Sequence, residues 1–225
     1  RAKVAVHYNT STDSANKVVK EIVDAGGDGI TLQGDVTDPE VCRSLVRDTV
    51  SHYGQLDVLI NNAGGLIRRE KVENITEELF SQVIDLNSRS ALIATGAAVK
   101  QMKKQGRGGA IINVSSIAAR HGGAGGSVLY AASKGFISTM TRGFAKELVD
   151  DGIRVNAVSP GVIVTPFHDR YSSPELLEKF RATIPMGRLG ESDECAGAFL
   201  YLASDQMSSY VTGQILEVNG GQFMP

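Results

Sequence analysis

The stretch Leu56–Gly65, with the sequence LDVLINNAGG, decides the fold. Its first half, Leu56–Ile60, is a short and nearly continuous apolar run, which is typical of a parallel strand covered on both faces. Its second half is polar and small, as expected where a strand ends in a loop. Parallel strands need crossover connections, and helices usually supply them. The stretch therefore predicts an α/β sheet with helices on both faces.

Strands and helices alternate on either side of this stretch. The expected strands are Lys3–Tyr8, Gly29–Val36, Leu56–Ile60, Ala110–Ser115, Arg154–Val158 and Gln214–Val218. The expected helices run from Thr10–Asp13 to Gly26, from Asp38-Pro39 to Gly54, from Thr76 to Gln105 with a break near Asn87, from Val128 to Val149, from Pro174 to Thr183 and from Ser192 to Leu202. This order predicts one domain, residues 1–225, built on a doubly wound parallel sheet.

Composition narrows the class of protein. The chain has 225 residues, of which 42% are hydrophobic, and its net charge is −2. This charge balance shows no excess of positive charge that would indicate binding to nucleic acid or to an anionic membrane. No apolar run approaches the roughly 20 residues that span a bilayer, and no secretion signal is visible. Cys42 and Cys195 are interpreted as reduced core residues, which predicts a cytoplasmic protein.

In such sheets, ligands bind where loops leave the carboxyl ends of the strands. The predicted strand ends carry small or polar residues, namely Asn9-Thr10, Asp35-Val36, Asn61–Gly64, Ser115-Ser116 and Ser159–Gly161. Topology alone therefore predicts a binding site at this edge, but no chemistry.

Tyr130 and Lys134 lie four residues apart on a predicted helix, so both side chains face the same way. At roughly 5 Å and an effective dielectric of about 20, an ammonium group stabilises a phenolate by about 3 kcal/mol, which lowers its pKa by about two units. A phenol near neutral pKa can act as a general acid or base. An exposed helix pair is the alternative interpretation.

Two further features accompany this pair. Ser115-Ser116 ends the preceding strand, where a hydroxyl group could hold a substrate oxygen beside Tyr130; ordinary end-of-strand turn chemistry is the alternative. Asn87 is a poor helix former inside a predicted helix. It predicts a helix break whose backbone carbonyl holds a water beside the Lys134 ammonium, the alternative being an exposed or capping residue.

Together the motifs resemble one family, the short-chain dehydrogenases/reductases. The motifs that match its order and spacing are Asp35-Val36, Asn61-Asn62-Ala63-Gly64, Asn87, Ser116, Tyr130-x-x-x-Lys134 and Pro160-Gly161. The resemblance covers essentially the whole chain and is strongest to the subgroup of 3-oxoacyl-carrier-protein reductases and sugar dehydrogenases. It implies a Rossmann-type fold and an NAD(P)(H)-dependent enzyme that interconverts a ketone or aldehyde and an alcohol.

The resemblance also implies roles for single residues. Tyr130 is the catalytic acid/base, Lys134 lowers its pKa and binds the nicotinamide ribose, Ser116 orients the substrate oxygen, and Asn87 supports a proton-relay water. The implied contacts of the cofactor are Asp35 and the Val36 backbone at the adenine, Asn62, Ala63 and Gly64 at the adenosine ribose, and Ile163 and Thr165, after Pro160-Gly161, at the nicotinamide carboxamide.

The edge that follows the strand Lys3–Tyr8 bears on the choice of cofactor. Enzymes selecting NAD place an acidic residue after the second strand of the fold. Here the sequence is Asn9-Thr10-Ser11, without an acid. An uncharged edge can accept a 2′-phosphate, so Asn9 is assigned to the cofactor and NADP is predicted, with NAD as the alternative.

The chain departs from the family at its start. The glycine-rich turn that holds the pyrophosphate should precede Lys3 by about 20 residues, and the runs Gly106–Gly109 and Gly122–Gly126 lie on the wrong side of the topology. We therefore expect the first strand and helix to lie upstream of Arg1. That strand would sit between Lys3–Tyr8 and Leu56–Ile60.

The substrate side is predicted less sharply. Residues 162–190 should form a lid whose Phe167, His168 and Tyr171 are candidates for substrate contact, although a solvated loop position is favoured for His168. Arg68-Arg69 could meet an anionic substrate or a carrier protein, with a solvated helix start as the favoured interpretation. His121 should border the substrate side.

Two other functions were weighed against a reductase acting on a small carbonyl or alcohol substrate. One is a catalytically silent subunit or scaffold with the same fold. The other, a serine hydrolase, is weak because Ser116 lacks the Gly-x-Ser-x-Gly elbow. The resemblance further implies a homotetramer formed through the helices at 76–105 and 128–149 and the final strand.

Overall fold

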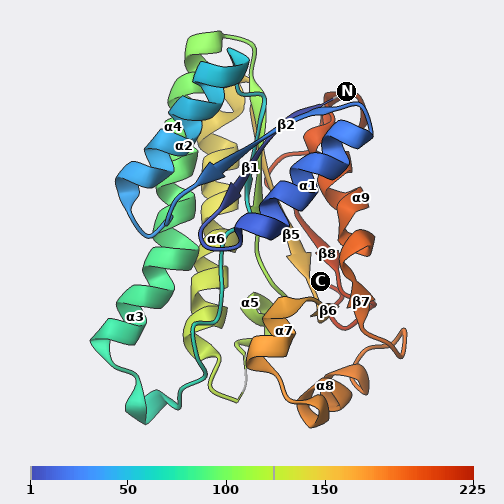
Figure 1. The fold of residues 1–225 in the computed structure, drawn as a ribbon. Helices are drawn as coiled ribbons and strands as arrows, with labels where there is room; N and C mark the ends of the chain where they lie inside the picture. Colours follow the sequence, from blue (N-terminus) through green and yellow to red (C-terminus); the bar gives the residue numbers. More distant parts are fainter. Residues whose placement is uncertain (1, 124) are drawn as a thin grey trace.

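A computed structural model describes residues 2–123 and 125–225 (Figure 1). Its strands are β1 (Lys3–Tyr8), β2 (Asp28–Gln33), β3 (Val58–Asn61), β4 (Gly109–Val114), β5 (Ile153–Pro160), β6 (Ile163–Val164), β7 (Gly190–Glu191) and β8 (Ile215–Val218). Its α-helices are α1 (Thr12–Asp24), α2 (Pro39–Tyr53), α3 (Glu77–Ile84), α4 (Ser90–Gln105), α5 (Ala118–His121), α6 (Val128–Leu148), α7 (Pro166–Tyr171), α8 (Pro174–Arg181), α9 (Ser192–Ala203) and α10 (Asp205–Ser208).

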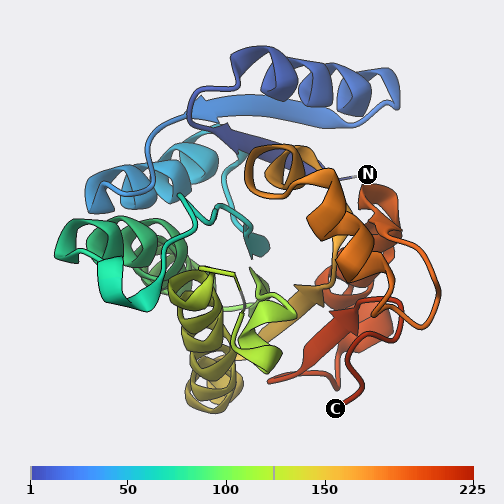
Figure 2. The same ribbon diagram turned by 90° about the horizontal axis from the view of Figure 1, so that it is seen from below.

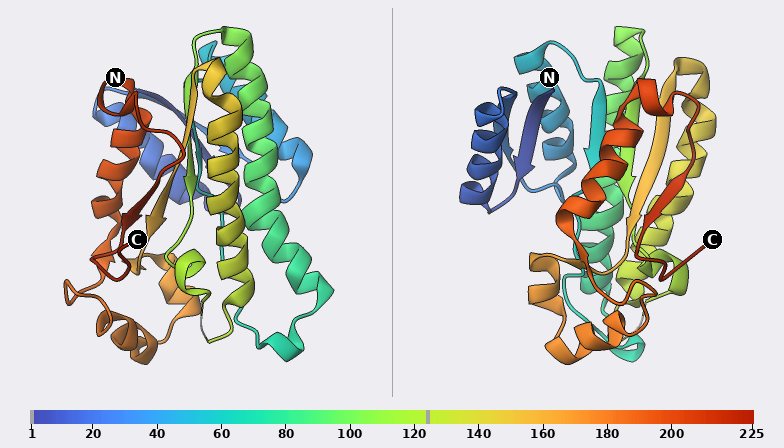
Figure 3. Two further views of the ribbon diagram at one scale, coloured as in Figure 1. Left: turned by 180° about the vertical axis from the view of Figure 1, so that it is seen from behind. Right: turned by 90° about the vertical axis from the view of Figure 1, so that its right-hand side faces the viewer.

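The strands form parallel sheets. β2 pairs with β1, the order β3-β4-β5-β8 makes a four-stranded sheet, and β6 pairs with β7. Helices α2, α4 and α6 lie on one face, and α1 and α9 lie on the other (Figures 1 and 3). The predicted doubly wound α/β architecture is confirmed.

Strand β5, at the centre of the sheet, is more deeply buried than strand β3, from which the sheet was predicted. β5 is buried along nearly its whole length, whereas Ile60 of β3 is 45% exposed. Within the described residues, β1 and β3 each pair along one edge only, and a strand with a free edge has fewer neighbours to cover it. Leu56 and Leu59 nevertheless pack in one apolar layer and Val58 in the other, so the expectation that this strand is covered on both faces is confirmed except at Ile60.

Two apolar layers sandwich β4, because successive side chains of a strand point to opposite faces. Ile111 belongs to the layer that also contains Met102 of α4 and Leu148 of α6. Ile112 packs in the other layer with Leu202 of α9. Burying one such side chain contributes about 1.5–3 kcal/mol, so β4 anchors helices on both faces.

Several boundary signals are confirmed. The Asp38 side chain accepts a hydrogen bond from the Glu40 backbone N–H at the start of α2, and Gly54 ends this helix with φ of 81°. The break expected near Asn87 is a π-helical turn, Asp85–Arg89, between α3 and α4. Helix α7 lies in the predicted lid, at residues expected to be a loop, and helix α5 was not predicted, because such short helices leave little periodicity to detect.

The carboxyl ends of the strands face the viewer in Figure 2, and α5, α7 and α8 gather at this end of the molecule. Gly106–Gly109 lies at the opposite end, before β4, as its place in the topology predicted. No helix of the described residues is both long and apolar enough to cross a membrane. Cys42 and Cys195 are buried free thiols, as expected.

Candidate active site

Tyr130 and Ser116 meet at the carboxyl edge of β4. Tyr130 is partly buried on the first turn of α6, and the Ser116 hydroxyl hydrogen-bonds to it. The Ser116 Oγ also accepts a bond of 3.1 Å from the Ala118 N–H, which fixes the serine against α5. The structure thus places a hydroxyl and a phenol side by side, as the spacing predicted.

The pKa of Tyr130 shifts opposite to the expected direction. Burial raises the pKa of this phenol, and the hydrogen bond from Ser116 lowers it only in part. Lys134 Nζ lies over the ring, 5.8 Å from its centroid. Burial of the phenol, rather than the Lys134 ammonium, sets the direction of the pKa shift in this arrangement, which is opposite to the expectation that Lys134 lowers it.

Lys134 is itself enclosed. Its side chain is 3% exposed, and Nζ donates a 2.7 Å hydrogen bond to the Val114 carbonyl at the end of β4. Desolvation lowers the pKa of this ammonium to about 8. An exposed Tyr–Lys pair is therefore excluded.

Asn87 clamps the loop after β3. Its Oδ1 accepts the Gly65 N–H at 2.9 Å, and its Nδ2 donates to the carbonyls of Gly65 and Val83, each at 2.9 Å. The residue is 1% exposed, so the interpretation as an exposed or capping Asn is wrong. The side chain, rather than the backbone, carries the contacts that the structure shows; the relay water stays a prediction.

Gly64 closes the cluster from the other side. A Cβ added here would lie 2.7 Å from Asn87 Oδ1 and 3.1 Å from Lys134 Nζ. Only a glycine lets the loop backbone come this close to the amide and the ammonium. Asn87, Ser116, Tyr130, Lys134 and Gly64 therefore form one compact cluster.

A buried polar ladder beneath the cluster was not foreseen. Asn61 Nδ2 donates to Asn113 Oδ1 (2.8 Å) and to Thr95 Oγ1 (2.9 Å), and Asn113 Nδ2 donates to Thr141 Oγ1 (2.9 Å). Asn61 and Asn113 are register partners on β3 and β4. An asparagine within the apolar run AIINVS was the signal available in the sequence.

Residues predicted for the adenosine ribose and for the nicotinamide lie in the two loops beside this cluster. Asn62 and Ala63 directly precede Gly64 in the loop after β3. The Pro160 carbonyl accepts a 2.9 Å bond from the Ile117 N–H, which brings the end of β5 beside Ser116. A Cβ on Gly161 would lie 2.7 Å from the Asn219 Cβ, so this loop is also closely packed.

The residues predicted for the adenine and for the 2′-phosphate edge lie apart. Asp35 and Val36 follow β2 and Asn9 follows β1, and within the described residues no hydrogen bond or ion pair links them to the cluster. Asp35 is exposed and its Oδ1 accepts bonds from the N–H (2.9 Å) and hydroxyl (2.8 Å) of Thr37. The Val36 carbonyl accepts from Cys42 Sγ, and the Asn9 carbonyl accepts from Gln33 Nε2.

Ile163 and Thr165 lead into the predicted lid. Ile163 pairs with Gly190 in the β6–β7 ladder, so the two ends of the 162–190 segment are joined. The Thr165 Oγ1 donates to the Ile163 carbonyl at 3.3 Å, just before α7. Both residues thus stand where the lid leaves the sheet.

Helix α7 carries the aromatic side chains of the lid. The Phe167 ring lies 5.6 Å from the Tyr130 ring and 4.9 Å from the Tyr171 ring, between centroids. His168 is half-buried, and its Nδ1 is 2.9 Å from Ser172 Oγ. The solvated loop position favoured for His168 is therefore wrong, and burial lowers the pKa of its imidazolium.

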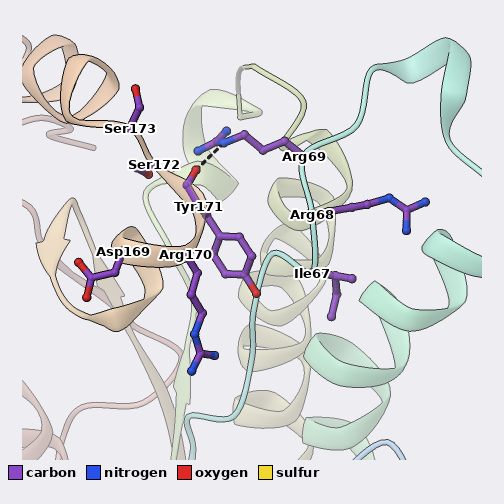
Figure 4. A pocket seen from close by; sticks show the side chains of 8 residues that line it. All are labelled: Ile67, Arg68, Arg69, Asp169, Arg170, Tyr171, Ser172 and Ser173. Atoms are coloured by element: carbon purple, nitrogen blue, oxygen red, sulfur yellow. Dashed lines mark hydrogen bonds between the residues drawn. The ribbon is translucent and has the colours of Figure 1, made fainter.

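Arg68-Arg69 does not start a helix, so the favoured interpretation of this pair is also wrong. Both residues lie in an irregular segment before Val72, and both line a cavity against α7 (Figure 4). His121 is exposed at the end of α5, where Nδ1 accepts from the Gly123 N–H at 3.2 Å. Of the run Gly122–Gly126, residue 124 lies outside the described residues.

The cluster fits the ribose and nicotinamide of a dinucleotide. Gly64 leaves room for a close approach, and the buried Lys134 ammonium has three donor hydrogens, of which one is used by Val114. Among the described residues, the hydrogen-bond partners of Ser116 are Tyr130 and a backbone N–H, and none is a histidine. A serine hydrolase needs a histidine at this position as its general base.

Comparison with known proteins finds relatives that agree with one another in the kind of protein they are. A family model described as enoyl-(acyl carrier protein) reductase matches residues 1–222. The uncharacterized oxidoreductase YgfF of Escherichia coli (strain K12) is 40% identical over 221 residues, 97% of this chain and 89% of that protein. The 3-oxoacyl-[acyl-carrier-protein] reductase FabG of Staphylococcus aureus (strain Mu50) is 39% identical over 221 residues, 98% of this chain and 88% of that protein.

A solved structure agrees with these relatives. The NADH-dependent reductase A1-R′ responsible for alginate metabolism has a TM-score of 0.90 and 38% identity, covering 100% of this chain and 88% of that one. Its complex with NAD has a TM-score of 0.86 and 37% identity, covering 100% and 87%. Nothing in these comparisons supports a silent scaffold.

The close packing around Gly64 leads to a testable prediction. Gly64→Ala should lower kcat for nicotinamide-dependent turnover by about 100-fold, because the new methyl group displaces Asn87 or the Lys134 ammonium. Gly65→Ala is the matched control, since a Cβ there meets its neighbours at 3.6–3.7 Å, an ordinary contact. Steady-state kinetics of both variants test this, and equal losses would contradict it.

The depressed pKa of Lys134 predicts a pH dependence of stability. Below pH 8 this lysine is protonated in both states, and folding carries the full cost of burying its charge. Between pH 8 and about pH 10.5 the unfolded chain binds more protons, so the unfolding free energy rises with pH, by about 3 kcal/mol in total. Lys134→Met should abolish this rise, whereas exposed Lys104→Met should not. Denaturant unfolding without nucleotide measures it, and equal slopes for wild type and Lys134→Met would refute it.

Proposed function

The chain belongs to the short-chain dehydrogenase/reductase family and is an NAD(P)-dependent oxidoreductase, and on this basis we propose that it reduces a ketone or aldehyde with Tyr130 as proton donor. The observation that carries the proposal is the hydrogen bond between Ser116 and Tyr130, with the Lys134 ammonium over the phenol ring. Asn87, Ser116, Tyr130 and Lys134 are the proposed catalytic or supporting residues.

The protein groups act in a definite order. The Ser116 hydroxyl holds the substrate carbonyl oxygen beside the phenol. Because the pKa of Tyr130 is raised, the phenol is protonated at neutral pH, and its O–H donates the proton that turns this oxygen into a hydroxyl. A bound nicotinamide supplies the hydride that adds to the carbonyl carbon. The Lys134 ammonium then stabilises the phenolate left on Tyr130.

A proposed set of residues holds the dinucleotide. Gly64 with Asn62 and Ala63, and the Lys134 ammonium, meet the riboses; Pro160, Gly161, Ile163 and Thr165 meet the nicotinamide; Asp35 and Val36 meet the adenine. Residues 162–190 form the lid over the substrate, with Phe167 against the catalytic phenol.

NADP is the proposed preference. Asn9, at the end of β1, is exposed and uncharged, so no carboxylate there repels a 2′-phosphate. The A1-R′ relative is named as NADH-dependent, which makes NAD the outcome to test against.

We further propose a cytoplasmic homotetramer. Exposed apolar side chains on the helices and strand expected at the interfaces support the assembly, namely Phe80, Leu92, Phe136 and Leu216. The buried free thiols of Cys42 and Cys195 suit a reducing compartment. A monomer in native mass spectrometry would reject the tetramer. Recovery of the protein outside the cytoplasm on cell fractionation would reject the cytoplasmic location.

Removal of the phenolic hydroxyl tests the chemistry. Tyr130→Phe should lower kcat by at least about 1,000-fold, because no other group in the cluster donates a proton at that position. Nucleotide affinity, followed by fluorescence titration, should change little, since the ring remains. Turnover of a good carbonyl substrate by this variant at the wild-type rate would refute the proposal.

A charge at the cofactor edge tests the preference between nucleotides. Asn9→Asp should lower kcat/KM for NADPH by about 10-fold or more, through repulsion of the 2′-phosphate, and change that for NADH little. Asn9→Ser is the uncharged control. A wild-type enzyme that already prefers NADH would overturn the assignment of NADP.

A further inference from the structure

A cavity of about 470 Å³ opens between the irregular segment Ile67–Arg69 and the end of α7, Asp169–Ser173 (Figure 4). This volume lies within the range of small-molecule sites, about 300–1,000 Å³. The catalytic cluster does not use these residues. The cavity is therefore a candidate for recognition of a part of the substrate away from the reacting carbonyl.

The walls of this cavity are predominantly positive. Arg68, Arg69 and Arg170 line it, against a single lining acid, Asp169. Arg68 is offset in part by Glu70, whose carboxylate is 3.7 Å from its Nε. In Figure 4 the Arg170 guanidinium and the Tyr171 hydroxyl lie at the same end of the cavity, whereas the Asp169 carboxylate projects away from them. An anionic group would find an exposed guanidinium and a phenol at that end.

The two walls are joined by Arg69. Its Nε donates to the Tyr171 carbonyl at 2.8 Å, drawn as a dashed line in Figure 4, and one terminal nitrogen donates to the Gly125 carbonyl at 3.1 Å. Burial lowers the pKa of this guanidinium. These bonds keep Arg170 and Tyr171 at a fixed place relative to the Ile67 segment.

The same segment contains strained backbone. Ile67 has φ of 65°, and it is the one non-glycine residue with positive φ among the described residues. The Arg68 N–H bonds to the Leu66 carbonyl at 2.9 Å across it, which makes a γ-turn. A β-branched residue adopts this conformation only where its surroundings enforce it, and such strain concentrates at ligand sites.

Two aromatic rings lie between the cavity and the reaction centre. The Tyr171 ring contacts Phe167, which contacts Tyr130. The Tyr171 hydroxyl also lies 3.7 Å from where a Cβ on Gly65 would be, and Gly65 is the residue clamped by Asn87. A ligand that reaches from the cavity to a carbonyl held by Ser116 and Tyr130 therefore has to extend past the Tyr171 and Phe167 rings.

We propose that this cavity binds the anionic group of a small carbonyl substrate, a carboxylate or a phosphate, with Arg170 as the residue that pairs with it. Arg69, which bonds to the Tyr171 and Gly125 carbonyls, supplies further positive charge, whereas Arg68 projects away from Arg170 in Figure 4. This specificity rests on the proposed reductase function and narrows its substrates to anionic carbonyl compounds whose charge is separated from the ketone by a chain long enough to extend past the Tyr171 and Phe167 rings.

The test compares charged and uncharged versions of one ketone. Short linear oxocarboxylates, with the ketone at different positions, are assayed beside their methyl esters, and phosphorylated hydroxyketones beside the parent hydroxyketones. Wild type should favour the anion in at least one pair by about 10-fold in kcat/KM. Arg170→Gln should remove most of this preference and leave the neutral partner within about twofold; Arg170→Lys should retain part of it.

Arg43→Gln is the matched control, because Arg43 is exposed on α2 and pairs with Glu40 at 3.2 Å, outside the cavity. An unchanged preference in Arg170→Gln, or equal losses for both members of a pair, overturns the subsite but leaves the reductase function standing. Absence of Tyr130-dependent turnover with every pair contradicts both. If the Arg170-dependent gain in kcat/KM is instead confined to thioesters of a carrier protein, the proposal of a small anionic substrate is overturned in favour of a protein partner.

Discussion

A buried ammonium group is the constraint on which the site depends. Lys134 Nζ is removed from water and rests on the Val114 carbonyl, and an ammonium in such a place is costly unless polar groups surround it. The surrounding groups come from elements distant in sequence: the end of β4, the loop after β3 and the π-helical turn before α4. The approach of all three requires Gly64, and their relative position is held by Asn87. The site is assembled around this charge.

Hydrogen bonds beneath the site fix the positions of the elements that carry its residues. Ser115 Oγ lies 2.7 Å from Ser138 Oγ and donates to the Lys134 carbonyl, so the end of β4 is fastened to the helix that carries Tyr130. The ladder from Asn61 through Asn113 to Thr141 joins β3, β4 and α6 in the same way. Apolar packing of Ile111 and Ile112 holds the layers together, but these directional bonds fix where one layer stands on the other.

Periodicity and end signals were enough to predict the order of strands and helices and the single domain, and spacing together with the family resemblance pointed to the residues that the structure brings together around Lys134. They worked because long amphipathic helices and apolar strands report burial directly. They failed where burial depends on distant partners: Ile60 of β3 is exposed, His168 is half-buried on α7 with Phe180 nearby, and Arg69 bonds to the end of α7. The direction of the Tyr130 shift was also missed, since spacing gives the distance to a charge but says nothing about desolvation. No local pattern predicts the positive φ of Ile67, which is imposed by its neighbours.

Arg69 bonds at once to the end of α7 and to the loop that precedes α6, and Glu70 beside it bonds to Gly126 of that loop. Three surface segments are in this way tied into one body. An insertion in any of them would break contacts in the other two. Among related chains, these segments are therefore expected to change length together and to be inherited as a set.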